Sequence, residues 1–125
     1  MIRIRHIFKS IAHAIRGVRV VFGSEQNFRI QVYAAVLVVA SGVLFSVRIY
    51  EWILLVLLIG SVLTLELVNS VFERIVDSFK PRIHPIVKDV KDIMAAAVLI
   101  VSVIAAVVGI IIFYPHVADL VRALP

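Results

Sequence analysis

Cysteine is absent from this 125-residue sequence. Disulfide frameworks, cysteine-based metal sites and thiol nucleophiles are therefore excluded. Residues 1–17 are basic but contain neither a continuous apolar segment nor a small-residue cleavage site, so we expect no signal peptide. The phosphate-binding loop GxxxxGKS/T and the kinase loop GxGxxG are also absent. Any nucleotide site in this chain must be of another kind.

Charged residues are few, at 17%, whereas 62% of the residues are hydrophobic. Soluble domains are nearer half apolar, and a water-soluble core of this size cannot use so much apolar surface. The composition therefore predicts an integral membrane protein, with residues 1–125 forming a single domain. The net charge of +5 is explained by basic residues that flank membrane spans, so we expect no nucleic-acid partner.

The hydrophobic pattern predicts one surface helix and three membrane spans. In residues 1–22, apolar side chains recur at helical spacing and basic side chains lie mostly on the other side, which is typical of an amphipathic helix in the membrane interface. Residues 28–47, 52–77 and 92–114 are each long and apolar enough to cross a hydrocarbon core of about 30 Å. We expect Pro115 to end the third span. The predicted fold class is an all-α membrane protein.

The basic residues predict the topology. All Lys and Arg residues except Arg48 and Arg122 lie before or at the start of the first span, or around a basic loop at residues 80–91. The positive-inside rule then places the N-terminus in the cytoplasm and the C-terminus outside. We expect a multi-pass protein of the bacterial plasma membrane.

Four polar side chains on the second span indicate a functional site. Glu66, Asn69, Glu73 and Asp77 are spaced 3, 4 and 4 residues apart, so they lie within an arc of roughly 80° on one helix face. Counted from Trp52, Glu66 lies about 9 Å inside the cytoplasmic boundary of the hydrocarbon core. Ionisable residues at such depth are costly and usually functional.

Further polar residues reach the same membrane level and suggest phosphoryl transfer. Glu25 and Glu73 at the boundary suit a hard divalent cation such as Mg²⁺. Glu66, which lies deeper, suits a general base, and Arg29 and Lys91 could neutralise phosphate charge. A metal, cations and a base are the parts that transfer of phosphate to a hydroxyl needs. The depth of the base points to a lipid alcohol as acceptor.

Three sequence blocks resemble a known family. ELVNSVFERIVD (Glu66–Asp77), KDIMAAAVLI (Lys91–Ile100) and SEQNFRI (Ser24–Ile30) are similar to the small bacterial membrane lipid kinases. That family contains the prokaryotic diacylglycerol kinases and the undecaprenol kinases. The similarity covers residues 11–114, and the spacing of its acidic and amide residues is specific for so short a chain.

The resemblance implies a homotrimer that transfers phosphate from ATP to a lipid alcohol, with active sites shared between subunits. Glu66 matches the family's proposed general base, and Glu25 and Glu73 match its metal-binding glutamates. A larger set matches positions around the bound ATP: Arg29, Glu25, Glu73, Asn69, Lys91, Asp92, Arg19 and Asp77.

The resemblance favours undecaprenol as the lipid, with diacylglycerol as the alternative. The NFRI block at residues 27–30 and the His84-Pro85 pair look like the undecaprenol branch. Gln31 supports neither branch, because the undecaprenol kinases usually have His there and the diacylglycerol kinases Glu.

Two readings without kinase activity stay open. A holin-like or scaffold protein would be purely structural, but it gives no reason to align four polar side chains on one face. A small proton-coupled transporter could use a buried glutamate, but such sites tend toward the membrane midplane. The same polar face could also be a structural ion-pair network that locks an oligomer.

Overall fold

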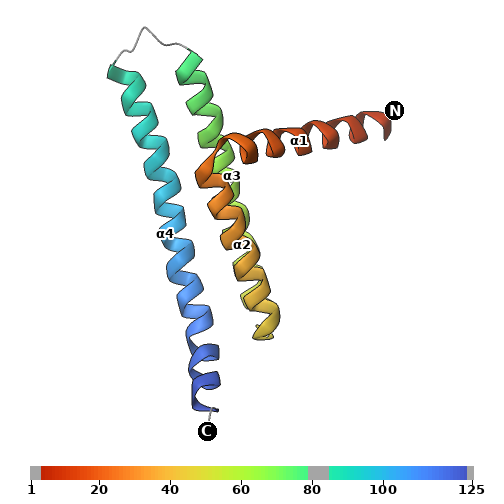
Figure 1. Ribbon diagram of the computed structural model, residues 1–125, viewed down its shortest axis with the longest axis vertical. Coiled ribbons are helices and arrows are strands. Elements are labelled where there is room, and N and C mark those ends of the chain that lie inside the picture. Colours follow the sequence, from red (N-terminus) through yellow and green to blue (C-terminus); the bar gives the residue numbers. More distant parts are fainter. Residues whose placement is uncertain (1–3, 79–84, 124–125) are drawn as a thin grey trace.

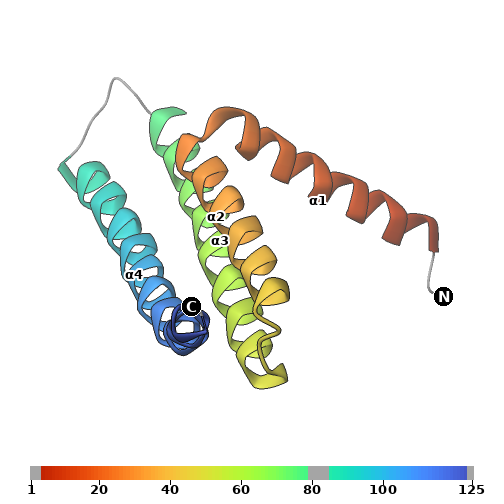
Figure 2. The same ribbon diagram turned by 60° about the horizontal axis from the view of Figure 1, so that its bottom comes forward.

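The computed structural model describes residues 4–78 and 85–123 as four α-helices: α1 Ile4–Ser24, α2 Gln26–Leu44, α3 Ile49–Ser78 and α4 Pro85–Arg122. In Figure 1, α2, α3 and α4 lie side by side, and α1 leaves the upper end of α2 and projects to one side, below the upper ends of α3 and α4. The turned view in Figure 2 shows the same arrangement. Helix α3 is central, because it packs against α4, α2 and α1.

Three of these helices are long and apolar enough to cross a membrane: Gln26–Leu44, Ile49–Ser78 and Ile86–Arg122. The prediction of three membrane spans is confirmed as far as helix length and composition are concerned. The buried apolar core is small and centres on Val47, Leu55 and Ile112. Most other large apolar side chains are exposed, with Leu37 exposed to 68% and Ile110 to 67%. Contact of so much apolar surface with water is unfavourable, so we expect lipid or another protein chain to cover it.

The helix bounds differ from the predicted spans. α2 begins at Gln26 and ends at Leu44 rather than covering 28–47, and α3 begins at Ile49 rather than at residue 52. The prediction that Pro115 ends the last span is wrong, since α4 continues through it to Arg122. A proline removes one backbone donor and crowds the preceding turn, but transmembrane helices tolerate it where neighbouring groups satisfy the freed carbonyl.

The start of α4 also differs from the sequence prediction. Residues 85–91 belong to the helix rather than to a basic loop, and residues 80–84 of that loop lie outside the described part of the chain. Pro85 is the first helical residue, a position where its missing N–H is not needed and its fixed φ favours the helix.

The α2–α3 connection is a tight turn built from backbone hydrogen bonds. The N–H of Val47 donates to the carbonyl of Gly42 at 3.1 Å, and the N–H of Ser46 donates to Val43 at 3.2 Å. Ser46 has a left-handed φ of 50°. This is a Schellman motif, which usually places glycine at the left-handed position. The serine explains why the sequence alone did not reveal where the helix ends.

The start of α3 is fixed by its own side chain and by α4. The N–H of Arg48 donates to Oε2 of Glu51 at 2.6 Å, which is half of a capping box. The other oxygen of Glu51 lies 3.5 Å from Nε2 of His116 on α4. The ring of His116 stacks on Phe45 with centroids 6.1 Å apart. The turn and the C-terminal part of α4 are therefore held together.

Replacing Gly42 with leucine should destabilise the α2–α3 hairpin. A Cβ on Gly42 would lie 2.9 Å from the Trp52 ring, so a larger side chain must displace that ring. We expect Gly42→Leu to cost about 1–3 kcal/mol of stability, the usual range for overpacking. Thermal unfolding in detergent, followed by circular dichroism, measures the change. Gly60→Leu is the control, because nothing lies within 4 Å of a Cβ on Gly60; equal effects of the two variants would contradict the prediction.

Candidate functional site

The site lies where α1 meets α2, against the C-terminal half of α3. Glu25 connects the two helices, and its extended backbone (φ −102°, ψ 117°) turns the chain from the direction of α1 to that of α2. The N–H of Glu25 still donates to the carbonyl of Val21 at 2.8 Å. The turn therefore fixes the place of this carboxylate on the bundle.

The polar face predicted on the second span is buried at Glu66 and Asn69, half-buried at Glu73 and exposed at Asp77. Glu66 is only 3% exposed and Asn69 only 8% exposed, and the next residue, Ser70, is 1% exposed. Oε2 of Glu66 accepts a hydrogen bond from Nε2 of Gln31 on α2 at 3.2 Å. Nδ2 of Asn69 donates to Oε1 of Glu73 at 3.3 Å, one turn further along α3. The two carboxylates are thus each held by a side-chain amide.

Glu25 joins this group from the helix corner. Both Glu25 and Glu73 lie close enough to Glu66 for their charges to repel its own. Arg74 of α3 ties the corner down: its Nη2 donates to Oγ of Ser24 at 2.6 Å and lies 3.8 Å from Oε1 of Glu25. The fold therefore brings together three carboxylates that are 41 and 7 residues apart, and Arg74 lies beside them.

Arg29 is engaged with the end of α1. Its Nη1 donates to the carbonyls of Phe22 and Gly23, each at 3.1 Å. These are among the last carbonyls of α1, which carry the negative end of the helix dipole. Arg29 thus braces the corner that carries Glu25, a role that the sequence did not suggest.

The remaining predicted site residues are more exposed. Nζ of Lys91 on α4 lies 3.2 Å from Oδ1 of Asp77 on α3, and both side chains are partly exposed, at 36% and 49%. Arg19 and Asp92 are exposed, and within the described residues the structure does not join either of them to the carboxylate cluster. Asp77 lies one helical turn beyond Glu73, so the Asp77–Lys91 pair follows the carboxylates along the C-terminal half of α3.

The carboxylates fit a magnesium ion only if the ion uses few protein ligands. Among the described residues, no group of three His, Asp or Glu side chains is arranged to hold a metal. Mg²⁺ commonly takes one or two carboxylates and completes its shell with water and phosphate oxygens. Glu25 and Glu73 are the two carboxylates whose charges act on Glu66.

Comparison with known proteins gives the family. The family model described as prokaryotic diacylglycerol kinase matches residues 12–113. The chain belongs to this family. It is a lipid kinase, so neither a scaffold nor a transporter role is its principal function. Its three helices that can cross a membrane agree with a bacterial membrane protein.

Individual relatives cover nearly the whole chain. The chain is 38% identical to the undecaprenol kinase of Bacillus subtilis over 90% of this chain and 91% of that protein. It is 30% identical to a diacylglycerol kinase of Synechocystis, over 92% of this chain and 66% of the relative. It is 28% identical to the diacylglycerol kinase of Escherichia coli K12, over 88% of this chain and 90% of the relative.

Sequence reasoning did not identify three features of this kinase. Gln31 touches Glu66, Arg74 touches Glu25, and Glu51 pairs with His116 at the far end of the bundle. Each contact joins residues from different elements of the fold, so helical spacing within one segment gives no signal for it. The one hint was that Gln31 is a polar residue within an apolar span.

Replacing Lys91 with glutamine tests whether this residue acts in catalysis rather than in folding. The exposed Asp77–Lys91 pair should contribute at most about 1 kcal/mol to stability. If Lys91 binds phosphate, losing its charged hydrogen bond should lower kcat/KM for ATP about 10- to 100-fold. Kinase assays and thermal unfolding together measure both effects. Lys88→Gln, on the same exposed turn, is the control, and an activity loss matched by an equal loss of folded protein would contradict the prediction.

Proposed function

We propose that this kinase transfers the γ-phosphate of ATP to a membrane lipid alcohol at the cytoplasmic face, with undecaprenol favoured over diacylglycerol. The observation that carries the proposal is Glu66. This carboxylate is 3% exposed, belongs to a membrane-spanning helix, is oriented by Gln31 and has two further carboxylates near it. A base at that depth reaches a hydroxyl that stays in the lipid.

Glu66 is the proposed general base. It takes the proton of the lipid hydroxyl as the hydroxyl oxygen forms its bond to the γ-phosphorus of ATP, and the bond from that phosphorus to the bridging oxygen of ADP breaks. The products are the lipid phosphate and ADP, with the proton left on Glu66. The hydrogen bond from Gln31 holds the carboxylate in one orientation. This lowers the entropic cost of reaching a reactive geometry.

Glu25 and Glu73 are the proposed magnesium ligands. A Mg²⁺ ion held by these two carboxylates would neutralise the negative charge that develops on the transferred phosphate. Asn69 orients Glu73 through its 3.3 Å hydrogen bond, and Arg74 balances the charge of Glu25. The amide and the guanidinium therefore hold the two carboxylates in place.

The proposed nucleotide surroundings combine cations and polar groups around this centre. Lys91 and Arg29 supply positive charge for the phosphates, and Asn69, Asp92, Arg19 and Asp77 complete the set by resemblance. Because Arg19 and Asp92 are exposed in the single chain, they would act only if another surface meets them. A homotrimer with shared sites supplies such a surface, and the exposed apolar faces of α2, α3 and α4 support this assembly.

The proposed orientation places α1 on the cytoplasmic surface. The apolar residues Ile7, Ile11, Ile15 and Val18 follow one another at spacings of 3 or 4 on α1, and each is about half exposed. Figure 1 shows α1 projecting to one side from the end of α2 rather than running along the bundle. A helix so placed can lie in the interface with its basic residues toward anionic lipid head groups.

Purified protein in bilayer discs should transfer ³²P from γ-labelled ATP to lipid, with a higher kcat/KM for undecaprenol than for diacylglycerol at equal mole fraction. The preference is expected because the relative with 38% identity is named an undecaprenol kinase, against 30% and 28% for two diacylglycerol kinases. Thin-layer chromatography of the labelled lipids gives the measurement. A higher value for diacylglycerol would reverse the substrate assignment, and no transfer to either lipid would remove the proposal.

The variants Glu66→Gln and Glu73→Gln should fail in different ways. Losing the base should lower kcat by roughly 10²–10⁴-fold, with nucleotide binding and the magnesium requirement kept. Losing a metal ligand should instead raise the magnesium concentration needed for half activity. Steady-state kinetics across a magnesium titration separate the two effects. If Glu66→Gln abolishes magnesium–ATP binding, or Glu73→Gln leaves the titration unchanged, the roles are assigned wrongly.

A further inference from the structure

Arg74 lies beside the carboxylate cluster, although helix periodicity assigns it no role. It follows Glu73 on α3, and its side chain is 47% exposed. Its Nη2 donates to Oγ of Ser24 at 2.6 Å and lies 3.8 Å from Oε1 of Glu25. The hydroxyl of Ser24 in turn donates to the same Oε1 at 3.2 Å. The serine therefore links the guanidinium of Arg74 to the carboxylate of Glu25.

These contacts use only one nitrogen of the guanidinium. An arginine side chain has N–H donors on all of its guanidinium nitrogens. Within the part of the chain that the structure describes, every side-chain contact of Arg74 is made by Nη2. The N–H groups of Nη1 and Nε therefore have no protein acceptor there. A guanidinium that is nearly half exposed and held by one arm can bind an anion with its unused donors.

The charges at this corner make Arg74 the cation that an anionic ligand meets. Three carboxylates lie close enough for their charges to interact: Glu25, Glu66 and Glu73. Arg29 uses its Nη1 on two carbonyls at the end of α1, and Lys91 pairs with an aspartate one turn beyond Glu73. Among the described residues, Arg74 is the cation that contacts the cluster itself. Like charges repel, so a nucleotide phosphate that approaches these carboxylates requires a cation at this place.

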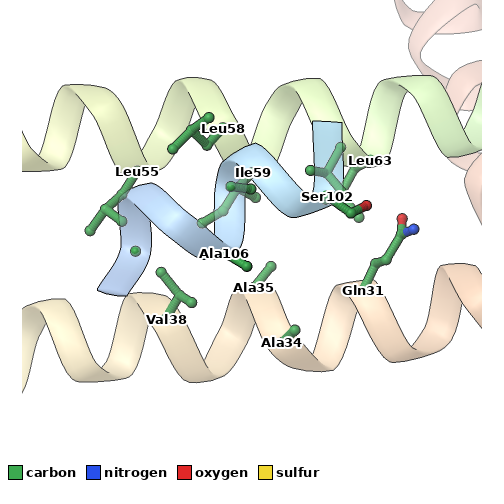
Figure 3. A pocket seen from close by; sticks show the side chains of 13 residues that line it. Gln31, Ala34, Ala35, Val38, Leu55, Leu58, Ile59, Leu63, Ser102 and Ala106 are labelled. Atoms are coloured by element: carbon green, nitrogen blue, oxygen red, sulfur yellow. The ribbon is translucent and has the colours of Figure 1, made fainter. Parts of the chain in front are cut away.

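The cavity between α2, α3 and α4 does not suit phosphates. Its volume is about 240 Å³, and Figure 3 shows Gln31 at one end and Leu55 and Val38 at the other. None of the described residues that line it is charged. Moving an anion into an apolar space without a charged partner is costly. The partly exposed corner at Arg74 is therefore the better place for phosphate.

We propose that Arg74 is a phosphate-binding residue of the nucleotide site and that Ser24 positions it. Nη2 keeps its hydrogen bond to Ser24, while the unused N–H groups donate to oxygens of an ATP phosphate. The pair with Glu25 is exposed and longer than a hydrogen bond, so it is weak and does not prevent this contact. The inference rests on the proposed function and adds to it a residue of the ATP site that the family resemblance does not assign.

Replacing Arg74 with methionine tests the proposal without turnover. Methionine keeps an apolar stem but removes the charge and the donors. We expect the Kd for the non-hydrolysable ATP analogue AMPPNP to rise about 10- to 100-fold, the effect of losing a charge-assisted hydrogen bond. Adenosine has no phosphate, so its Kd should not change. Displacement of a fluorescent ATP analogue from the full-length protein in bilayer discs, with magnesium and without a lipid acceptor, measures both constants.

Arg122→Met is the matched control. Nη1 of Arg122 lies 3.7 Å from Oδ1 of Asp119 on the last turns of α4, so this arginine also pairs with a carboxylate, but far from the cluster. Its replacement should leave both Kd values unchanged. In kinase assays, Arg74→Met should raise the KM for ATP and leave the KM for lipid unchanged, because the residue meets the nucleotide alone.

Two further variants separate phosphate binding from a structural role. Arg74→Lys keeps the positive charge but not the donor geometry of a guanidinium, so AMPPNP should bind more tightly to it than to Arg74→Met. Ser24→Ala removes the hydroxyl that holds Nη2 and should raise the Kd for AMPPNP by less than Arg74→Met does. A residue that only braced the helix corner would instead lower the unfolding temperature and weaken AMPPNP and adenosine equally.

The inference is overturned if Arg74→Met binds AMPPNP as tightly as the unaltered protein does, or if AMPPNP and adenosine lose affinity to the same degree. It also fails if Arg74→Lys, corrected for the amount of folded protein, binds AMPPNP no better than Arg74→Met. Should Arg74→Met not fold, Arg74→Lys still decides, because it must weaken AMPPNP and not adenosine. A protein that binds AMPPNP through Arg74 but transfers no phosphate to lipid would refute the proposed function alone.

Discussion

The structure depends on keeping Glu66 buried inside an apolar helix. An isolated carboxylate at that depth is expensive, so it requires polar partners on a neighbouring helix. Gln31 supplies the hydrogen bond across the α2–α3 contact, and this contact in turn requires that the two helices keep their register. The short Schellman turn at Ser46 fixes that register from the other end.

The helix corner at Glu25 is the second part on which the site depends. Arg29 neutralises the end of α1, and Arg74 reaches from α3 to the same corner. Neither contact is strong alone, since the Arg74–Glu25 pair is partly exposed at 47% and 27%. Together they place the Glu25 carboxylate near Glu66, so the C-terminal end of α1 is fixed to the candidate site.

The two ends of the bundle differ in how they are built. At the far end, Glu51 caps α3 and meets His116, which lies beyond the residues matched by the family model. The side-chain contacts of that end are the 2.6 Å hydrogen bond from the N–H of Arg48 to Glu51 and the 3.5 Å approach of Glu51 to His116. Among the described residues, buried polar atoms without a hydrogen-bond partner occur at both ends: Oε1 of Gln31 and Oγ of Ser70 toward α1, and Nε2 of His116 at the far end. The end near α1 differs in that Gln31 also bonds Glu66, so its polar groups lie beside the carboxylates of the candidate site.

The amino-acid sequence by itself determined the helical class, the three spans and the polar face from Glu66 to Asp77, because helix periodicity and bilayer thickness act on one segment at a time. It also carried the family resemblance. The tertiary structure alone decided that Gln31 faces Glu66, that Arg29 braces α1 and that α4 continues past Pro115. Those outcomes depend on which helices meet and at what register, and spacing along a single helix does not contain that information.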